Sequence, residues 1–386
     1  MTYHRLFAIS LWLWCLIGTA LATPEFARRY QIQSCTVCHT VVPKLNAAGM
    51  DFLARGYRPA PELNREKVDT VPLSAWLGAR RDDQVSKGHQ NFSLGKVELI
   101  SGGTLDDSVS YFIEWRPVSL EARGDGSLRD RSGRFEDVQI SWKIDNSWTV
   151  TAGQYRPLQQ IEPGRRLALS APVVFDANLD GPAGGSKRQQ SLRGFKVGDR
   201  SPGLTINYQS IHGKYAMDGL FHSVTVPFSG EFSIPLNPEA RREASFEFET
   251  IPKGVVLETY YRQQLNSVGV HAFVGEDRWS TGLIGETAVG DFNLLGGVGL
   301  DGRKGQSQRF RGSLAVEYLP VFVDSDWRSA IGFRVDVLND GHTGTAYVPY
   351  LVISGPNEGG LNSLLQLEYR SQKGNNRLQL DLSVFF

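Results

Sequence analysis

Two cysteines and a histidine lie close together near the start of the chain, at Cys35, Cys38 and His39. The C-x-x-C-H spacing is typical of c-type haem attachment. Two thiols three residues apart on one turn can each form a thioether to a vinyl group of the macrocycle, and the following imidazole then reaches the iron as proximal ligand. The motif therefore predicts one covalent haem c, bound by Cys35 and Cys38, with His39 on the iron.

Two other kinds of site use paired cysteines. A thioredoxin-like redox pair needs a βαβ setting, and a zinc site needs a second pair of Cys or His ligands nearby. After Cys38 the chain has no further cysteine, and the next histidine is His89. A disulfide between residues so close would close almost no loop and would add little stability. These comparisons favour the haem interpretation.

The stretch after the motif could cover one face of a haem. It is predicted to form a short helix after Pro43, on which Leu45, Gly49, Phe52 and Leu53 make an apolar stripe. A segment of about fifty residues is marginal as an independent domain. The predicted haem segment, residues 23–70, therefore needs shelter from the rest of the chain.

The sixth haem ligand has several candidates. Met50 is the only methionine of this segment, and Met/His ligation would raise the redox potential. Helix packing is the alternative role for Met50, because its phase is off the apolar stripe. Histidines elsewhere are further candidates, although each is more often a solvated residue. They are His89, His212, His222, His271 and His342.

The first 22 residues predict export. A short basic start and an apolar stretch lead to Ala20, Leu21 and Ala22, which is the pattern of a signal peptide with a small-residue cleavage site. An uncleaved membrane anchor is the alternative, but the apolar run is short for a span of about 20 residues. Cys15 would leave with the signal peptide, so the mature chain would keep only the two cysteines of the motif.

The charge balance excludes one class of partner. The chain has 41 Lys and Arg residues against 41 Asp and Glu residues. A nucleic-acid-binding surface needs a basic excess, so no nucleic acid is expected as a partner. After the signal peptide no apolar run approaches the length of a membrane helix. Any membrane contact must therefore come from strands.

From residue 71 onward the apolar residues recur at every second position. In the stretch 309–318, Leu314 and Val316 share one face, while Arg311 and Glu317 share the other. The same split recurs at 329–338, 364–370 and 377–386. Runs of about ten residues separated by turns predict an all-β fold, a transmembrane antiparallel β-barrel of about 16–18 strands over residues 71–386. A large soluble sandwich is the alternative.

The end of the chain supports a barrel. Residues 377–386 alternate and finish on Phe386, which resembles the closing strand of bacterial outer-membrane barrels. Counting back from Phe386 places long connections near 118–133 and 155–190 outside the cell, and assigns residues 225–242 to the periplasmic side. Pro349 should remove one donor from a strand ladder.

Tryptophans are predicted at both edges of the membrane. Trp142, Trp148 and Trp327 should lie near the periplasmic interface, and Trp115 and Trp279 near the outer one.

These motifs together resemble a known family, the fused monohaem cytochrome–porins of the bacterial outer membrane, of the iron-oxidising porin cytochrome c type. The close resemblance covers residues 24–58, and the likeness of the barrel is architectural. Residues 29–31 depart from the Gln-Thr-Gly that is usual there. The matching residues are Phe26, Ala27, Arg28, Cys35, Cys38, His39, Pro43, Leu45, Gly49, Phe52, Gly56 and Tyr57.

The resemblance implies a sixteen-stranded barrel with its haem segment in or at the lumen. It implies an electron conduit between an extracellular donor such as Fe(II) and periplasmic carriers such as soluble cytochromes, in contact with outer-membrane lipid. The alternatives are a transport porin with a haem-bearing N-terminal plug, electron export to an extracellular acceptor, and peroxidase or gas-sensor chemistry. No catalytic residue is assigned, and an iron:cytochrome-type oxidoreductase activity stays open.

Overall fold

The computed structural model of the chain describes residues 25–32, 34–60, 73–84, 89–122, 128–130, 132–157, 166–176, 192–193, 200–212, 218–228, 230–234, 247–251, 253–305, 307–320, 326–339, 344–356, 362–373 and 376–385. The predicted signal peptide, residues 1–22, lies outside these ranges. So do Phe386 and the predicted boundary at residues 70 and 71.

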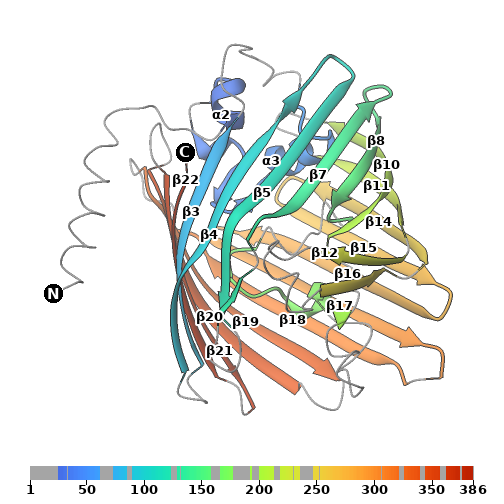
Figure 1. Ribbon diagram of the computed structural model, residues 1–386. Coiled ribbons are helices and arrows are strands. Elements are labelled where there is room, and N and C mark those ends of the chain that lie inside the picture. Colours follow the sequence, from blue (N-terminus) through green and yellow to red (C-terminus); the bar gives the residue numbers. More distant parts are fainter. Residues whose placement is uncertain are drawn as a thin grey trace.

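Sixteen long antiparallel strands form a closed barrel (Figure 1), which confirms the predicted fold class. The last strand pairs with the first along nine residue pairs and closes the wall. The strands are β3 (Ser74–Gln84), β4 (His89–Thr104), β5 (Val109–Ala122), β7 (Arg134–Lys143), β8 (Trp148–Tyr155), β10 (Ser201–His212), β11 (Asp218–Pro227), β14 (Gly254–Gln263), β15 (Asn266–Gly275), β16 (Arg278–Val289), β17 (Phe292–Arg303), β18 (Arg309–Tyr318), β19 (Arg328–Asn339), β20 (Gly344–Gly355), β21 (Asn362–Gln372) and β22 (Arg377–Phe385).

The remaining elements are short. The N-terminal ones are α2 (Glu25–Arg29), the 3₁₀ turn η1 (Cys35–Val37), the paired strands β1 (His39–Val41) and β2 (Lys44–Leu45), and α3 (Ala47–Ala54). A small sheet joins β9 (Leu192–Arg193), β12 (Gly230–Ile234) and β13 (Glu247–Ile251), β6 (Leu128–Asp130) extends β5, and α4 (Val173–Asp176) is one turn. None of the described helices is long and apolar enough to cross a membrane.

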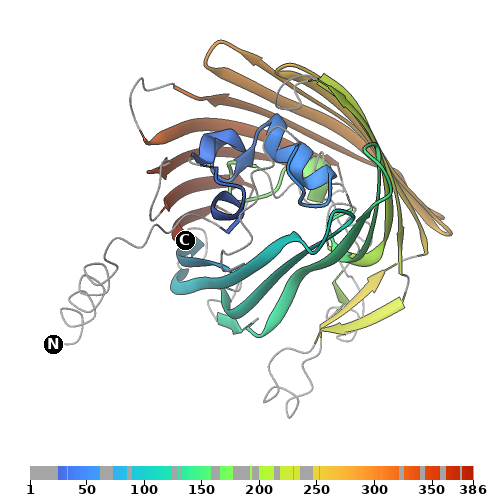
Figure 2. The ribbon, with the colours of Figure 1, turned by 90° about the horizontal axis from the view of Figure 1, so that it is seen from above.

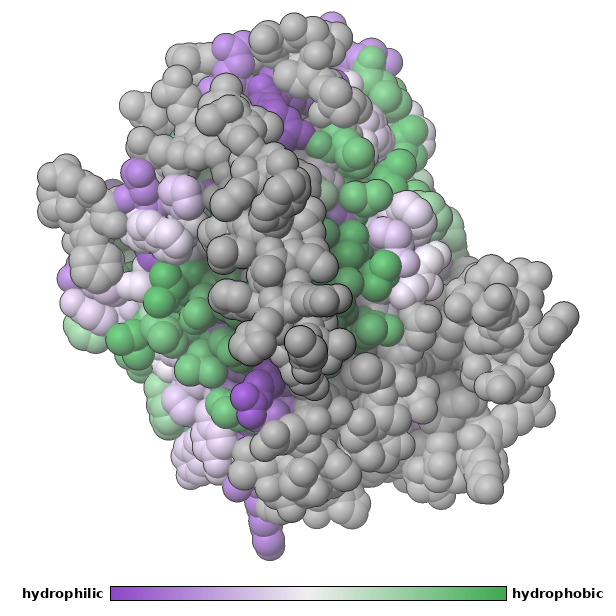
Figure 3. All heavy atoms as spheres, turned by 60° about the vertical axis from the view of Figure 1, so that its left-hand side comes forward, coloured by the Kyte–Doolittle hydropathy of each residue, from purple (hydrophilic) through white to green (hydrophobic). Residues whose placement is uncertain are grey.

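The wall is apolar outside and polar inside. On β18, Leu314 is 57% exposed, whereas Arg311 and Glu317 of the same strand are 1% and 2% exposed. Apolar residues gather on the outer wall in Figure 3. A soluble sandwich packs its apolar faces against each other, so this inverted arrangement contradicts that alternative. The predicted alternation is confirmed with its polar face turned inward.

The two ends of the barrel differ in their connections. We call the end at which β22 finishes the short-turn end, at the top of Figure 1; it carries the turns at 105–108, 144–147, 264–265 and 290–291. The long connections between β5 and β7 and between β8 and β10 lie at the opposite, long-connection end, as predicted.

The position predicted for residues 225–242 is wrong. β14 runs in the same direction as β22, which finishes at the short-turn end. β14 therefore begins at the long-connection end, and the connection from β11 reaches it there. Within this connection β12 pairs with β13, and β13 with β9, instead of with the wall. In the sequence these short strands alternate like wall strands. Counting one of them as a membrane crossing moves the connection to the wrong side of the membrane.

Two other predictions concern single residues of the wall. Pairing between β20 and β21 skips Val348 and Pro349, so the predicted ladder gap is confirmed. Trp142, Trp148 and Trp327 are exposed at the short-turn end, which agrees with an aromatic girdle there.

At the other end the two predicted tryptophans lie on strands of the wall. Trp279 is the second residue of β16, at the long-connection end, as predicted. Trp115 lies near the middle of the long strand β5 but pairs with Phe135, the second residue of β7, so it is level with the long-connection end of that neighbouring strand.

Candidate functional site

Segment 34–60 lies inside the barrel, toward its short-turn end (Figure 2). Its side chains bond to inward-facing wall residues. Lys44 Nζ lies 2.6 Å from a carboxylate oxygen of Glu317 on β18. Arg58 Nη2 donates to the carbonyl of Ser141 on β7 at 3.0 Å. From the wall, Arg262 Nη1 on β14 donates to the carbonyl of Ala47 at 3.2 Å. The segment therefore contacts both sides of the lumen.

The C-x-x-C-H motif begins on one tight turn. Ser34 caps the turn η1, and its hydroxyl accepts from the Thr36 amide at 3.3 Å. The Cys38 amide donates to the Cys35 carbonyl at 3.1 Å, which completes the turn. Both thiols are half-buried and are not bonded to each other. Their spacing on a turn is the one that two thioether bonds to a single macrocycle require.

Asn46 fastens helix α3 to the motif. Its side-chain amide donates to the carbonyls of Thr36 and Val37 at 3.0 and 3.1 Å. Its Oδ1 accepts from the Gly49 amide at 3.2 Å and caps α3. Sequence reasoning missed this residue, although an asparagine directly before an apolar helix is an N-cap signal.

Gly49 allows α3 to approach the motif closely. A methyl group at this position would overlap the carbonyl oxygen of Cys38 and press on the side chain of Leu45. The absence of a Cβ is therefore what brings the apolar stripe of α3 against the haem motif.

His39 is positioned by the short hairpin of β1 and β2. It pairs with Leu45, and Val41 pairs with Lys44. Desolvation lowers the pKa of His39 to about 4, more than its backbone hydrogen bonds with Pro43 and Lys44 raise it. The ring is therefore neutral at pH 7, which is the form that binds a metal.

A cavity of about 560 Å³ joins Cys35, Cys38 and His39. Its volume lies within the usual range for a cofactor site, about 300–1,000 Å³. One part of its lining is apolar and comes from both the segment and the wall: Phe26, Ile32, Leu45, Phe52, Leu53, Trp76, Ile100 and Phe112. The other part is charged: Arg80, Lys96, Glu98, Glu114, Arg116, Asp137, Arg156, Arg166, Arg200 and Asp381.

The charged part of the lining is a connected set of ion pairs on the wall. Arg116 lies 2.5 Å from Glu98 and 3.0 Å from Glu136. Arg200 lies 2.6 Å from Glu136 and 2.5 Å from Asp137. Because Arg116 and Arg200 each lie between carboxylates, these charges offset one another out of water.

These features fit a haem. Thiols on one turn match its vinyl groups, a neutral imidazole matches its iron, and apolar side chains match the faces of the ring. Cationic side chains on the wall match its two carboxylates. Among the described residues, no three His, Cys, Asp or Glu side chains are arranged to hold a free metal ion.

Met50 does not line this cavity. It is 8% exposed, belongs to an apolar cluster with Phe221 and Val256 of the wall, and its sulfur accepts from Arg262 Nη2 at 3.5 Å. It borders a second cavity of about 440 Å³ on the other side of the motif. The structure therefore brings Cys35, Cys38 and His39 together, but does not bring Met50 to them.

The other predicted histidines are dispersed. His271 is buried inside the wall on β15, beside the ring of Phe175 at a centroid distance of 6.4 Å. His222 shares the outer face of β11 with Val224 and bonds to Thr259. The side chains of His89, His212 and His342 lie outside the described residues.

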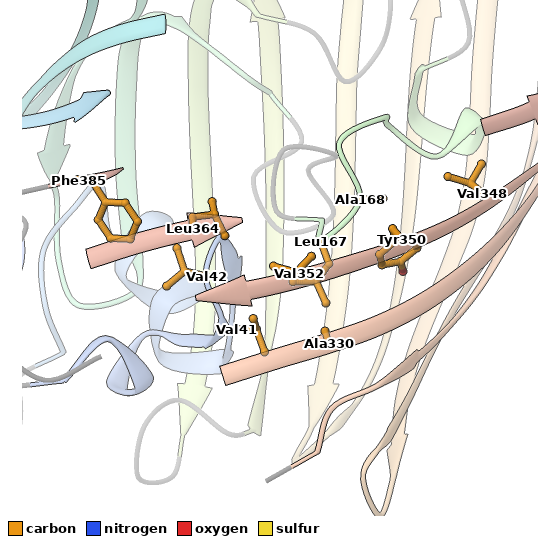
Figure 4. Close-up of a cluster of buried hydrophobic side chains, with 10 residues drawn as sticks. All are labelled: Val41, Val42, Leu167, Ala168, Ala330, Val348, Tyr350, Val352, Leu364 and Phe385. Carbon is orange, nitrogen blue, oxygen red and sulfur yellow. The ribbon is translucent and has the colours of Figure 1, made fainter. Parts of the chain in front are cut away.

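A second segment, residues 166–176 with α4, also folds into the lumen. Gln366 Nε2 donates to the Leu167 carbonyl at 2.7 Å, and Arg334 Nη1 to the Ser170 carbonyl at 2.8 Å. Figure 4 shows Leu167 close to Val352 of the wall, and both belong to one apolar cluster with Val41 of segment 34–60. No distinct signal in the sequence predicts this position, since an apolar run inside a long connection has no fixed place.

Sixteen antiparallel strands with an apolar exterior and a polar, occupied interior define a porin-type barrel. No protein-family model matches the sequence, and no curated protein matches it. Among solved structures, an anion-selective porin from Comamonas acidovorans superposes with a TM-score of 0.52 at 11% identity, over 82% of this chain and 98% of that chain.

Other similar structures are also from outer-membrane proteins. A mutant of the Rh. blastica porin gives a TM-score of 0.48 at 11% identity, over 81% of this chain and 99% of its own. The outer membrane channel DcaP of Acinetobacter baumannii gives 0.44 at 12% identity, over 81% and 96%. At these identities the likeness shows the fold alone, and the chemistry must come from the site.

Proposed function

We propose that this chain is an outer-membrane electron conduit that carries one covalently bound haem c inside a porin-type barrel. The observation that carries the proposal is the cavity of about 560 Å³ lined at once by Cys35, Cys38, His39 and the inner wall. An open diffusion pore would have no use for this motif, with its helix fastened by Asn46 and Gly49.

The location in the outer membrane is supported by the wall. Its exposed apolar residues suit lipid, and barrels of this kind place short turns in the periplasm and long connections outside the cell. The short-turn end, where segment 34–60 lies, would then face the periplasm. This orientation puts the haem site near soluble periplasmic carriers such as cytochromes.

Each part of the site has a distinct task. A bound haem supplies a one-electron iron couple. Cys35 and Cys38 fix it to the segment, and His39 holds its iron through a neutral nitrogen. Phe52 and Leu53 keep water from the ring. The wall cations offset its carboxylates, which would otherwise be costly to bury.

Electrons would pass between a donor at the long-connection end, for which Fe(II) is the first candidate, and carriers at the short-turn end. Export to an extracellular acceptor uses the same path in reverse. Both directions require the same residues.

A transport porin with an N-terminal plug is the second candidate, and the porin-type fold favours it. Against free transport stands the occupancy of the lumen by segments 34–60 and 166–176, which both contact the inner wall. An ion-conducting state would need at least one of them to move.

An optical experiment on the purified full-length protein tests the main proposal. We expect a c-type absorption spectrum that survives acid extraction, and reduction of the oxidised protein by Fe(II) or another extracellular donor. A mass spectrum that showed Cys35 and Cys38 unmodified would contradict the proposal. A steady ion current through haem-loaded protein in a planar bilayer would favour the transport porin instead.

A further inference from the structure

Lys44 is a buried cation that segment 34–60 presents to the barrel wall. The residue is 7% exposed. Its Nζ lies 2.6 Å from Glu286 Oε1 on β16 and 2.6 Å from Glu317 Oε2 on β18. One lysine from the segment therefore bridges two carboxylates on different strands.

The wall around these carboxylates is built to hold them. Asn293 Nδ2, on β17 between the two strands, donates to Glu286 Oε1 at 2.8 Å and to Glu317 Oε2 at 2.8 Å. Tyr350, on β20, donates its hydroxyl to Glu317 Oε1 at 2.8 Å. Residues of β16, β17, β18 and β20 thus contribute to one cation-binding pocket.

The charges of this pocket balance only partly within the wall. Glu286 and Glu317 place two carboxylates side by side, Asn293 and Tyr350 offer them neutral donors, and Arg262 on β14 lies close enough to Glu286 to act on its charge. A like-charge pair removed from water is unfavourable unless a cation lies between its members. Burial alone would lower the pKa of Lys44, but the two carboxylates raise it well above its ordinary value, so the lysine stays charged.

Lys44 is also well placed to hold the whole segment. It pairs with Val41 in the hairpin that carries His39, and Asn46 links that hairpin to the haem motif. The contacts of Arg58 and Ala47 with the wall involve backbone carbonyls, which are weaker than a charged pair. The strongest polar contact of the segment described here is thus made by Lys44.

We propose that Glu286 and Glu317 form a receptor site in the barrel wall for Lys44, and that this latch keeps segment 34–60 in the lumen and the pore closed to ions. The latch is intramolecular and does not depend on a haem. The latch goes beyond the proposed electron conduit. It assigns a role in closing the channel to residues that do not line the cavity of about 560 Å³ at Cys35, Cys38 and His39.

Conductance of the purified full-length protein in planar bilayers tests the latch. The wild type should stay closed, and K44M should open, with at least a tenfold higher open probability. The matched control is K253M, since Lys253 is exposed and pairs with exposed Glu276 at 3.6 Å. K253M should stay closed like the wild type.

A compensating variant separates the latch from general damage. In K44M/E286Q/E317Q no uncompensated carboxylate remains, and neutral groups of the same shape can replace a buried ion pair at little cost. We expect this triple variant to keep the heat resistance of the wild type but still to open like K44M, because no ion pair holds its segment. Should K44M fail to form a heat-resistant barrel, E317Q alone, which keeps the lysine and one carboxylate, should open partially.

The outcomes are decisive in both directions. A K44M or E317Q barrel as closed as the wild type, or a wild type that conducts steadily, overturns the latch. Equal opening of K44M and K253M overturns it as well. The optical spectrum of each sample is recorded in parallel. A missing haem would contradict the electron conduit, whereas a closed K44M barrel would contradict only the latch.

Discussion

The lumen holds two chain segments that are bound to the wall in opposite ways. Segment 34–60 reaches out with its own side chains, as Lys44 does toward Glu317. Segment 166–176 is held mainly by its backbone, because Arg334 and Gln366 of the wall donate to its carbonyls and Glu368 accepts from the Ser170 amide.

The difference shows in which segment the wall recognises particular side chains. Backbone groups are the same in every residue, so the wall recognises the path of segment 166–176 more than its side chains. Segment 34–60 is recognised through particular residues. Segment 34–60 brings Cys35, Cys38 and His39 to the cavity of about 560 Å³, whereas segment 166–176 adds only Arg166, Ala168 and Leu169 to its lining. We therefore place the chemistry in segment 34–60 and a lining role in segment 166–176.

The largest effect should come from the cysteines. In C35S/C38S the thioether bonds cannot form, and we expect complete loss of covalently bound haem, measured by haem staining after denaturing electrophoresis. Segment 166–176 shares no residue with the motif, so protease cleavage within it should stay at the wild-type level. Haem staining that persisted in this variant would refute the assignment of the motif.

The next effect concerns the other segment. Arg334 is buried, pairs with Asp336 at 3.0 Å and donates to two carbonyls of segment 166–176. R334M leaves Asp336 without its partner, and we expect a loss of about 3–5 kcal/mol in stability, seen as a lower thermal midpoint.

The haem spectrum of R334M should be unchanged, which separates the two segments. K304M, in an exposed turn, is the control and should keep the wild-type midpoint. A spectrum altered by R334M as strongly as its midpoint would show that the two segments act as one unit.

A smaller effect should follow from Gly49→Ala. The added methyl group would overlap the Cys38 carbonyl, so α3 must shift, at about 1–3 kcal/mol. We expect less haem incorporated per barrel, measured as the ratio of haem to protein absorbance. Gly285→Ala is the matched control, because its methyl group would meet only the Ser267 carbonyl at 3.7 Å. If both variants behave alike, close packing of α3 on the motif is not required.

The smallest effect sharpens the contrast between side-chain and backbone recognition. N46A removes the cap of α3 and two bonds to the motif, and we expect about 1 kcal/mol lower protection of α3 in hydrogen exchange. S170A should change segment 166–176 by less, because Arg334 still bonds to the Ser170 and Ala171 carbonyls. A larger effect for S170A would reverse the comparison.

The barrel could be predicted because apolar and polar residues alternate along each of its strands. Successive side chains of a strand point to opposite faces, so apolar residues such as Leu314 face lipid and polar residues such as Glu317 face the lumen, whatever the rest of the fold is. The three-stranded sheet of β9, β12 and β13 could not be predicted, since its strands carry the same period and only the pairing partner distinguishes them.

The candidate site was predictable only in its local part. Cys35, Cys38 and His39 follow from spacing along the chain. Their surroundings do not, because Lys44 and Glu317 are 273 residues apart and nothing in a single sequence pairs them. Met50 is ambiguous in the sequence, where its phase off the apolar stripe favours packing only slightly over ligation, and the structure surrounds it with apolar wall residues.

The distance along the chain between Lys44 and its pocket has a consequence for biogenesis. Segment 34–60 precedes the strands of this pocket in the chain, and the pocket is complete only once β16, β17, β18 and β20 have taken their places in the wall. Contacts of such long sequence separation form late in folding. For the haem that we propose, this order implies attachment to Cys35 and Cys38 before the barrel forms, so that the finished wall would close around a segment that already carries it.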